Sequence, residues 1–168
     1  MMSPAYFQTF ARYNTWANGL VYDAAAELPD SAYRTPRPAA YFSSLHGTLN
    51  HLLLVDQLWI GRAEGADPGF TGLDQILHAD LRALRRARET EDLRLIAFAE
   101  RQSEVDLARD ISYRSLVGEA YSAPLSRILR NLFNHQTHHR GQAHALLKEA
   151  GRQPPDLDMF VFWSETEG

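Results

Sequence analysis

Four long stretches of the sequence carry apolar residues at intervals of three and four, and proline or glycine lies between successive stretches. Such an interval gathers apolar side chains on one face of an α-helix. The stretches are residues 3–28, 43–65, 73–102 and 124–150. Amphipathic helices of this length bury their apolar faces against one another. The sequence therefore predicts an all-α fold, a four-helix bundle.

The ends of these helices carry recognisable signals. Ser3 followed by Pro4 suits the start of the first helix, and Ser43 or Ser44 suits the cap of the second. Thr90 is a candidate position for a break in the third helix. These signals support the four predicted segments.

Two other segments depart from the helical pattern. Residues 107–123 carry short apolar patches around Gly118, which indicate an extended loop or a small hairpin before the last helix. The tail DLDMFVFW, residues 156–163, is short and apolar. We expect this tail to pack back onto the bundle.

Length and charge limit the classes of function. A chain of 168 residues suits one core, so we expect a single domain over residues 1–168. The net charge is −4, and the basic residues gather only in one group. That group is expected to be a solvated helix face, which disfavours a nucleic-acid partner. Its members are Arg82, Arg85, Arg86 and Arg88.

The N-terminal segment, residues 1–20, has polar residues throughout and lacks the apolar stretch of a signal peptide. No run in the chain approaches the roughly 18 apolar residues that span a bilayer. We therefore expect a cytoplasmic protein without a membrane partner.

The sequence contains no cysteine. This excludes disulfides, thiolate nucleophiles and cysteine-ligated zinc. A metal ion would have to bind histidine, aspartate or glutamate.

The fourth predicted helix contains FNHQTHHRGQ, residues 133–142, with three histidines in five positions. At about 100° per residue, His139 falls near the centre of the buried stripe and His135 falls on the same side, whereas His138 lies at the margin. Imidazoles at i and i+4 can reach one cation at about 2.0–2.1 Å. His135 and His139 are therefore either metal ligands or hydrogen-bonded core histidines.

A third ligand would have to come from a facing helix. The second predicted helix offers His46 and His51, which are five residues apart and lie on different faces. Both faces are apolar, so periodicity does not choose between them. Each is alternatively a core histidine bonded to a backbone carbonyl.

The combination of motifs resembles the DinB/YfiT-like family of metalloenzymes. LHGTLNHLLLVDQLWIGRAEG at residues 45–65 and LFNHQTHHRGQ at residues 132–142 carry the resemblance, together with YNTWAN at 13–18 and PPDLDMFVFW at 154–163. The resemblance covers nearly the whole chain and implies a four-helix bundle with up-down-down-up connectivity. It also implies that the metal ligands are His51, His135 and His139.

Three neutral imidazoles would leave at least one position on a divalent cation open, which is typical of catalytic sites. Such a site suits Zn²⁺, Ni²⁺ or Fe²⁺. Relatives of this family include enzymes that use a metal-bound low-molecular-weight thiol. The resemblance thus implies a metal-dependent enzyme, a thiol-dependent transferase or hydrolase-like, that takes a small-molecule substrate and imports its thiol. The alternative is a non-enzymatic metal-binding stress-response protein, and a bundle without metal is a third interpretation.

Several polar residues are candidates for roles around the metal. Gln142 is a candidate to face the cavity, and Asp56 or Asn134 to orient a ligand imidazole, but for each of them a structural or exposed position is the simpler interpretation. Arg140 is either a group that binds a substrate carboxylate or, the simpler interpretation, a surface arginine.

Four aromatic residues are either core or the lining of an apolar pocket, namely Tyr13, Trp16, Trp59 and Phe133. A symmetric homodimer through a helix face is a further expectation, since two-fold pairing is the commonest assembly of such bundles.

Overall fold

The structure is a computed structural model that describes residues 3–38 and 40–166. The predicted domain of residues 1–168 includes five residues outside the described ranges, 1–2, 39 and 167–168. In chain order the elements are α1 (Pro4–Ala26), α2 (Asp30–Arg34), α3 (Leu45–Ala63), α4 (Leu81–Glu100), α5 (Glu104–Ala108), β1 (Asp110–Arg114), β2 (Ala120–Pro124), α6 (Leu125–Glu149) and α7 (Met159–Thr166).

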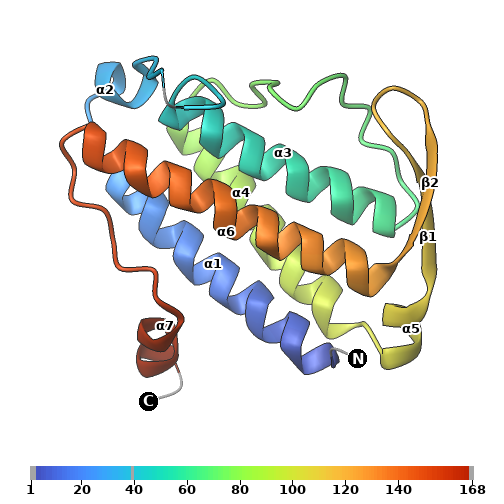
Figure 1. The fold of residues 1–168 in the computed structure, drawn as a ribbon. Coiled ribbons are helices and arrows are strands. Elements are labelled where there is room, and N and C mark those ends of the chain that lie inside the picture. The colour runs from blue at the N-terminus through green and yellow to red at the C-terminus, as the bar shows by residue number, and fades with distance from the viewer. Residues whose placement is uncertain (1–2, 39, 167–168) are drawn as a thin grey trace.

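The four long helices α1, α3, α4 and α6 form the predicted bundle (Figure 1). In Figure 1, α1 and α6 run in one direction, and α3 and α4 run in the opposite direction. The connectivity is therefore up-down-down-up, as the resemblance implied. The parallel pair α3 and α4 needs a long connection, and residues 64–80 return along the bundle to provide it.

Helices α1, α3 and α6 begin and end close to the predicted bounds, but the third predicted helix is shorter than expected. It begins at Leu81 because the Asp80 side chain caps it, accepting from the backbone N–H groups of Arg82 and Ala83. The preceding loop is held to α3 by Asn50, whose Oδ1 accepts from the His78 backbone N–H at 2.9 Å. The predicted break at Thr90 is wrong, since α4 is continuous there.

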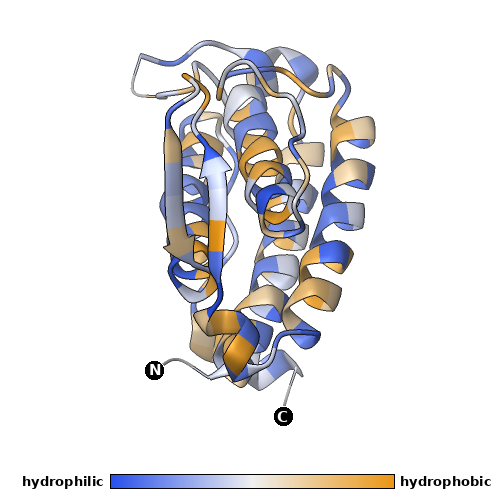
Figure 2. Ribbon diagram, turned by 90° about the vertical axis from the view of Figure 1, so that its right-hand side faces the viewer, coloured by the Kyte–Doolittle hydropathy of each residue, from blue (hydrophilic) through white to orange (hydrophobic). Residues whose placement is uncertain are grey.

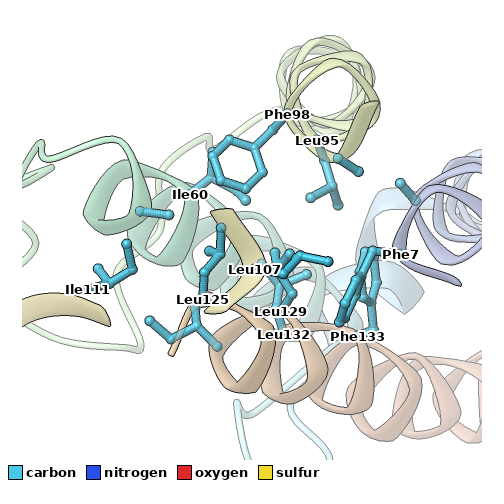
Figure 3. Packing of buried hydrophobic residues seen from close by; sticks show 14 residues of the cluster. Phe7, Ile60, Leu95, Phe98, Leu107, Ile111, Leu125, Leu129, Leu132 and Phe133 are labelled. Atoms are coloured by element: carbon cyan, nitrogen blue, oxygen red, sulfur yellow. The ribbon is translucent and has the colours of Figure 1, made fainter. Parts of the chain in front are cut away.

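The core lies between the long helices, and each helix alternates apolar and polar residues along its length (Figure 2). The largest cluster of buried side chains draws on all four (Figure 3). Among the residues labelled in Figure 3 are Phe7, Ile60, Leu95 and Leu129, one from each helix. In the described residues, no helix is long and apolar enough to cross a membrane.

The predicted insert before the last helix is a two-stranded antiparallel hairpin, with Ser112 opposite Ser122. It is preceded by the short helix α5, which the sequence pattern did not predict and which a capping box of Ser103 and Asp106 starts. The hairpin packs against α3 through Tyr113, whose ring centroid is 5.0 Å from that of Trp59. The hairpin thus closes one side of the bundle beside α3.

The apolar tail packs back onto the bundle, as predicted. It forms α7, and Phe162 packs against the rings of both Tyr13 and Trp16 on α1, with centroid distances of 5.7 and 5.6 Å. The hydroxyl of Tyr13 donates to the Leu157 carbonyl. Two of the four candidate aromatic residues therefore anchor the tail.

Charged residues lie inside the bundle, and this corrects two predictions. Arg88 is not part of a solvated helix face: it is 2% exposed, and its guanidinium lies 2.8 Å from Asp56 and 3.0 Å from Asp92. Arg140 is not a surface arginine either, because it is also 2% exposed and donates to the side-chain oxygens of Asn14 and Asn18. Helical periodicity alone did not reveal that the buried stripe includes an ion pair.

Candidate metal centre

Three histidines from two helices come together in the bundle. His51 lies on α3, whereas His135 and His139 lie on successive turns of α6. One nitrogen of each lies within 4.8 Å of the corresponding nitrogen of the other two. The Nε2 atoms of His51 and His135 are 2.9 Å apart. The structure therefore brings His51, and not His46, to the pair on α6.

A hydrogen bond between the helices fixes this register. Gln136 follows His135 in the chain, is fully buried, and donates from Nε2 to the carbonyl of Leu52 at 3.1 Å. Leu52 follows His51. The bond thus joins the immediate neighbours of two of the three histidines, and a slip of α6 against α3 would break it.

Oxygen acceptors orient two of the imidazoles. His51 Nδ1 lies 2.8 Å from the carbonyl oxygen of Leu73, and His139 Nδ1 lies 2.8 Å from Oε1 of Gln142. Since both partners accept, each Nδ1 carries the hydrogen, and the lone pair resides on Nε2. Gln142 was predicted to face the cavity, whereas sequence reasoning missed Leu73 because it acts through its backbone.

Burial keeps the imidazoles neutral. It lowers the pKa of His51 to about 4, and together with the neighbouring imidazoles it lowers the pKa of His135 to about 3. Burial also lowers the pKa of His139. Neutral imidazole is the form that binds a metal, so protons do not compete for these nitrogens near pH 7.

The residues fit a divalent transition metal. Two nitrogens that bind one cation at about 2.0–2.1 Å lie about 2.9–3.4 Å apart for bond angles of about 90–109°. The His51–His135 separation of 2.9 Å falls in this range. Among the described residues the group consists of imidazoles alone, a donor set that suits Zn²⁺, Ni²⁺ and Fe²⁺.

One side of the group is covered by Phe42. Its ring stacks on His51 with centroids 3.6 Å apart and planes 19° apart, and it meets His139 edge-on at 5.4 Å. The chain reaches this position through Ser43, whose φ of 68° lies in the left-handed region that few residues other than glycine adopt. Gly47 makes room for it, since a Cβ there would lie 2.0 Å from the Phe42 carbonyl oxygen.

Gly47→Ala is therefore expected to displace Phe42 from His51 and to reduce the free energy of unfolding by about 1–3 kcal/mol, the usual cost of overpacking. Chemical denaturation measures the effect. Gly19→Ala on α1 is the matched control, because an added Cβ there meets nothing within 4 Å. It should leave stability unchanged or raise it by up to about 1 kcal/mol. Equal effects of the two substitutions would contradict the close contact.

The other two histidines considered lie apart from the group. His46 is buried, and its Nδ1 lies 2.9 Å from the hydroxyl of Tyr33. Its partner is thus a side chain, and not the backbone carbonyl of the alternative prediction. His138 is exposed on α6, as the helical projection indicated, with its Nε2 3.2 Å from the Gln142 amide.

An open cavity of about 360 Å³ adjoins the group at His135. Its walls come from α3, from the loop that carries Leu73, and from the β1–β2 hairpin. Besides His135 it is lined by Val55, Leu58, Trp59, Arg62, Leu73, Tyr113, Ser115, Leu116 and Tyr121. A small molecule in this cavity would therefore lie against His135, one member of the histidine group.

A sequence model of the DinB family matches residues 1–167. The chain belongs to the DinB family. Protein DinB of Bacillus subtilis is 28% identical over 165 residues, which is 92% of this chain and 93% of that protein.

Two solved structures of DinB-like proteins share the fold. One, from Bacillus cereus ATCC 10987, has a TM-score of 0.62 at 20% identity and covers 86% of this chain and 90% of its own. The other, from Bacillus subtilis, has a TM-score of 0.64 at 20% identity and covers 90% and 98%. The bundle described above is thus the DinB fold.

The remaining candidates have other places in this DinB-family chain. Asp56 pairs with Arg88 and does not orient a ligand imidazole, and Asn134 is exposed. Phe133 belongs to the core, whereas Trp59 lines the cavity. Of the aromatic residues predicted for a pocket, Trp59 alone lines the cavity beside His135.

Proposed function

We propose that this DinB-family protein is a metal-dependent enzyme, a thiol-dependent transferase or hydrolase-like, with a divalent transition metal on His51, His135 and His139. One observation carries the proposal. Three neutral imidazoles form a single group, and a cavity large enough for a small molecule opens onto it.

A divalent cation in this position supplies Lewis-acid chemistry and lowers the pKa of a thiol or water that it binds, so that a nucleophile forms near neutral pH. The protein's own groups hold and shield the site. Leu73 and Gln142 fix the tautomers of His51 and His139, and Phe42 covers the group on one side. Because the sequence has no cysteine, a sulfur nucleophile would come from a low-molecular-weight thiol.

A thiol-acceptor screen tests the proposal. The protein is loaded separately with Zn²⁺, Ni²⁺ and Fe²⁺, then mixed with cysteine, glutathione or coenzyme A and an aryl halide. In the reaction the carbon–sulfur bond forms, the carbon–halogen bond breaks, and the thiol proton passes to solvent. A parallel screen with ester substrates tests hydrolysis. We expect turnover with at least one metal, and its loss on chelation and in His139→Ala.

The rival function is a non-enzymatic metal-binding protein of the stress response. One outcome of the screen distinguishes the enzymatic function from this rival. A protein that holds a full complement of metal but turns over no pair of donor and acceptor, and no ester, would contradict the enzymatic proposal and support the rival.

A further inference from the structure

One face of α3 leads away from the histidine group to an arginine. His51, Val55, Leu58 and Arg62 follow at intervals of four, three and four residues, which places them along one side of the helix. At 1.5 Å per residue, Arg62 lies about 16 Å along the axis from His51. His135 and Arg62 both line the cavity of about 360 Å³, together with Val55 and Leu58.

Arg62 is held in place without a carboxylate. Its guanidinium carbon lies 4.9 Å from the ring centroids of both Trp59 and Tyr113, and Nη2 donates to the Arg114 carbonyl at 2.6 Å. Within residues 3–38 and 40–166, no carboxylate oxygen lies within 4.0 Å of it. Within the described residues, none of its N–H groups therefore has an anionic partner.

Arg62 also lines a second, outer cavity of about 680 Å³, which shares the hairpin residues Tyr113 and Tyr121 with the first. Asp67 lines this outer cavity as well. Arg114 lines it too, but its guanidinium donates to the Gly118 carbonyl within the hairpin. Among the described residues that line these two cavities, Arg62 is the arginine or lysine common to both.

The walls between the histidines and Arg62 are largely apolar. Leu58 and Trp59 of α3 form one side, and Leu116 in the turn of the hairpin forms the other. A charged group would find few polar partners along this stretch. An apolar group there would be removed from water, and this burial would stabilise the complex.

We propose that the site takes an amphipathic organic anion. Its reacting end lies at the histidine group, its apolar body lies between Leu58, Trp59 and Leu116, and its anionic group pairs with Arg62. A planar guanidinium with free N–H groups binds a carboxylate or a phosphoryl group through paired hydrogen bonds. The inference rests on the proposed function, because it assumes that the reacting end binds a metal on the three histidines.

The test uses protein loaded with Co²⁺ and a probe that carries a thiol at one end and an anion at the other. Mercaptooctanoate, its methyl ester and the corresponding mercapto-phosphonate are titrated, and the thiolate-to-cobalt absorption reports binding of the sulfur. We expect the carboxylate to bind at least about 10-fold more tightly than the ester. Comparison of the carboxylate with the phosphonate then identifies the preferred anion.

Arg62→Gln should abolish this preference and leave Co²⁺ content and ester binding unchanged, whereas Arg62→Lys should retain part of it. Arg86→Gln, an exposed arginine of α4, is the matched control and should behave as the unchanged protein. Normal Co²⁺ uptake without a preference for either anion would overturn the inference and leave the proposed function standing. A failure of the unchanged protein to take up Co²⁺ would overturn both.

Discussion

Arg88→Met is expected to reduce the free energy of unfolding by about 3–5 kcal/mol, the usual cost of breaking a buried ion pair. The substitution leaves Asp56 and Asp92, which are 0% and 2% exposed, without their cation. Burial already raises the pKa of Asp56 to about 6 with the arginine present. Methionine replaces most of the arginine volume with an uncharged, unbranched side chain, so the loss reports charge more than packing. Urea denaturation at pH 7 measures it.

Arg85→Met on the same helix is the matched control. Arg85 pairs with Asp23 and Glu89, but all three side chains are at least 36% exposed. Exposed pairs contribute about 0–1 kcal/mol each, so this variant should stay close to the unchanged protein. If both substitutions cost the same, the charges inside the bundle do not have the structural importance assigned to them here.

His139→Ala is expected to lower metal affinity at least about 10-fold, because two imidazoles rarely hold a divalent cation. Competition with a chromophoric chelator, using Zn²⁺, measures the affinity. His139 is 9% exposed, and its removal also frees the Gln142 oxygen. The bundle should remain folded, since the apolar core lies on other residues of α6.

His138→Ala, at the position next to His139, is the matched control. His138 is adjacent in sequence but exposed, and it lies outside the group of three. Its loss should change affinity less than about twofold, because it donates no lone pair to the site. Equal losses in the two variants, or the reverse order, would contradict the ligand assignment.

Much of the fold could be predicted from periodicity. Three of the four long helices match their predicted ranges closely, because glycine, proline and capping residues mark their ends. The start of α4 was misplaced by eight residues, since Leu73 and Ile76 continue the apolar spacing although they are 42% and 51% exposed. The Asp80 cap decides the actual start. The spacing of apolar residues alone does not show where a capping side chain starts the helix.

The histidine group could be predicted only in part. The i, i+4 spacing and the inward projection selected His135 and His139 over His138, but the choice of His51 over His46 required the resemblance. The physical reason lies in the register between α3 and α6, which the hydrogen bond from Gln136 to Leu52 fixes. Such a contact joins residues 84 positions apart, and no local pattern encodes it.

The buried charges escaped prediction for a related reason. Arginine is rarely buried without a partner, so Arg88 and Arg140 were assigned to the surface. Arg88 pairs with Asp56 of α3 and with Asp92 of its own helix, and Arg140 donates to Asn14 and Asn18 of α1. The polar residues on the core-facing sides of α1 and α3 were the signal in the sequence that could have indicated buried partners for the two arginines.

Elemental analysis of the purified protein tests whether the three histidines hold a metal ion. Cells are grown with added zinc, nickel and iron, and the protein is desalted before its metal content is measured. We expect about one equivalent of a divalent transition metal per chain, the content of one three-imidazole site. A content below about 0.1 equivalent of any transition metal would contradict it, since a site of this kind would have retained its ion.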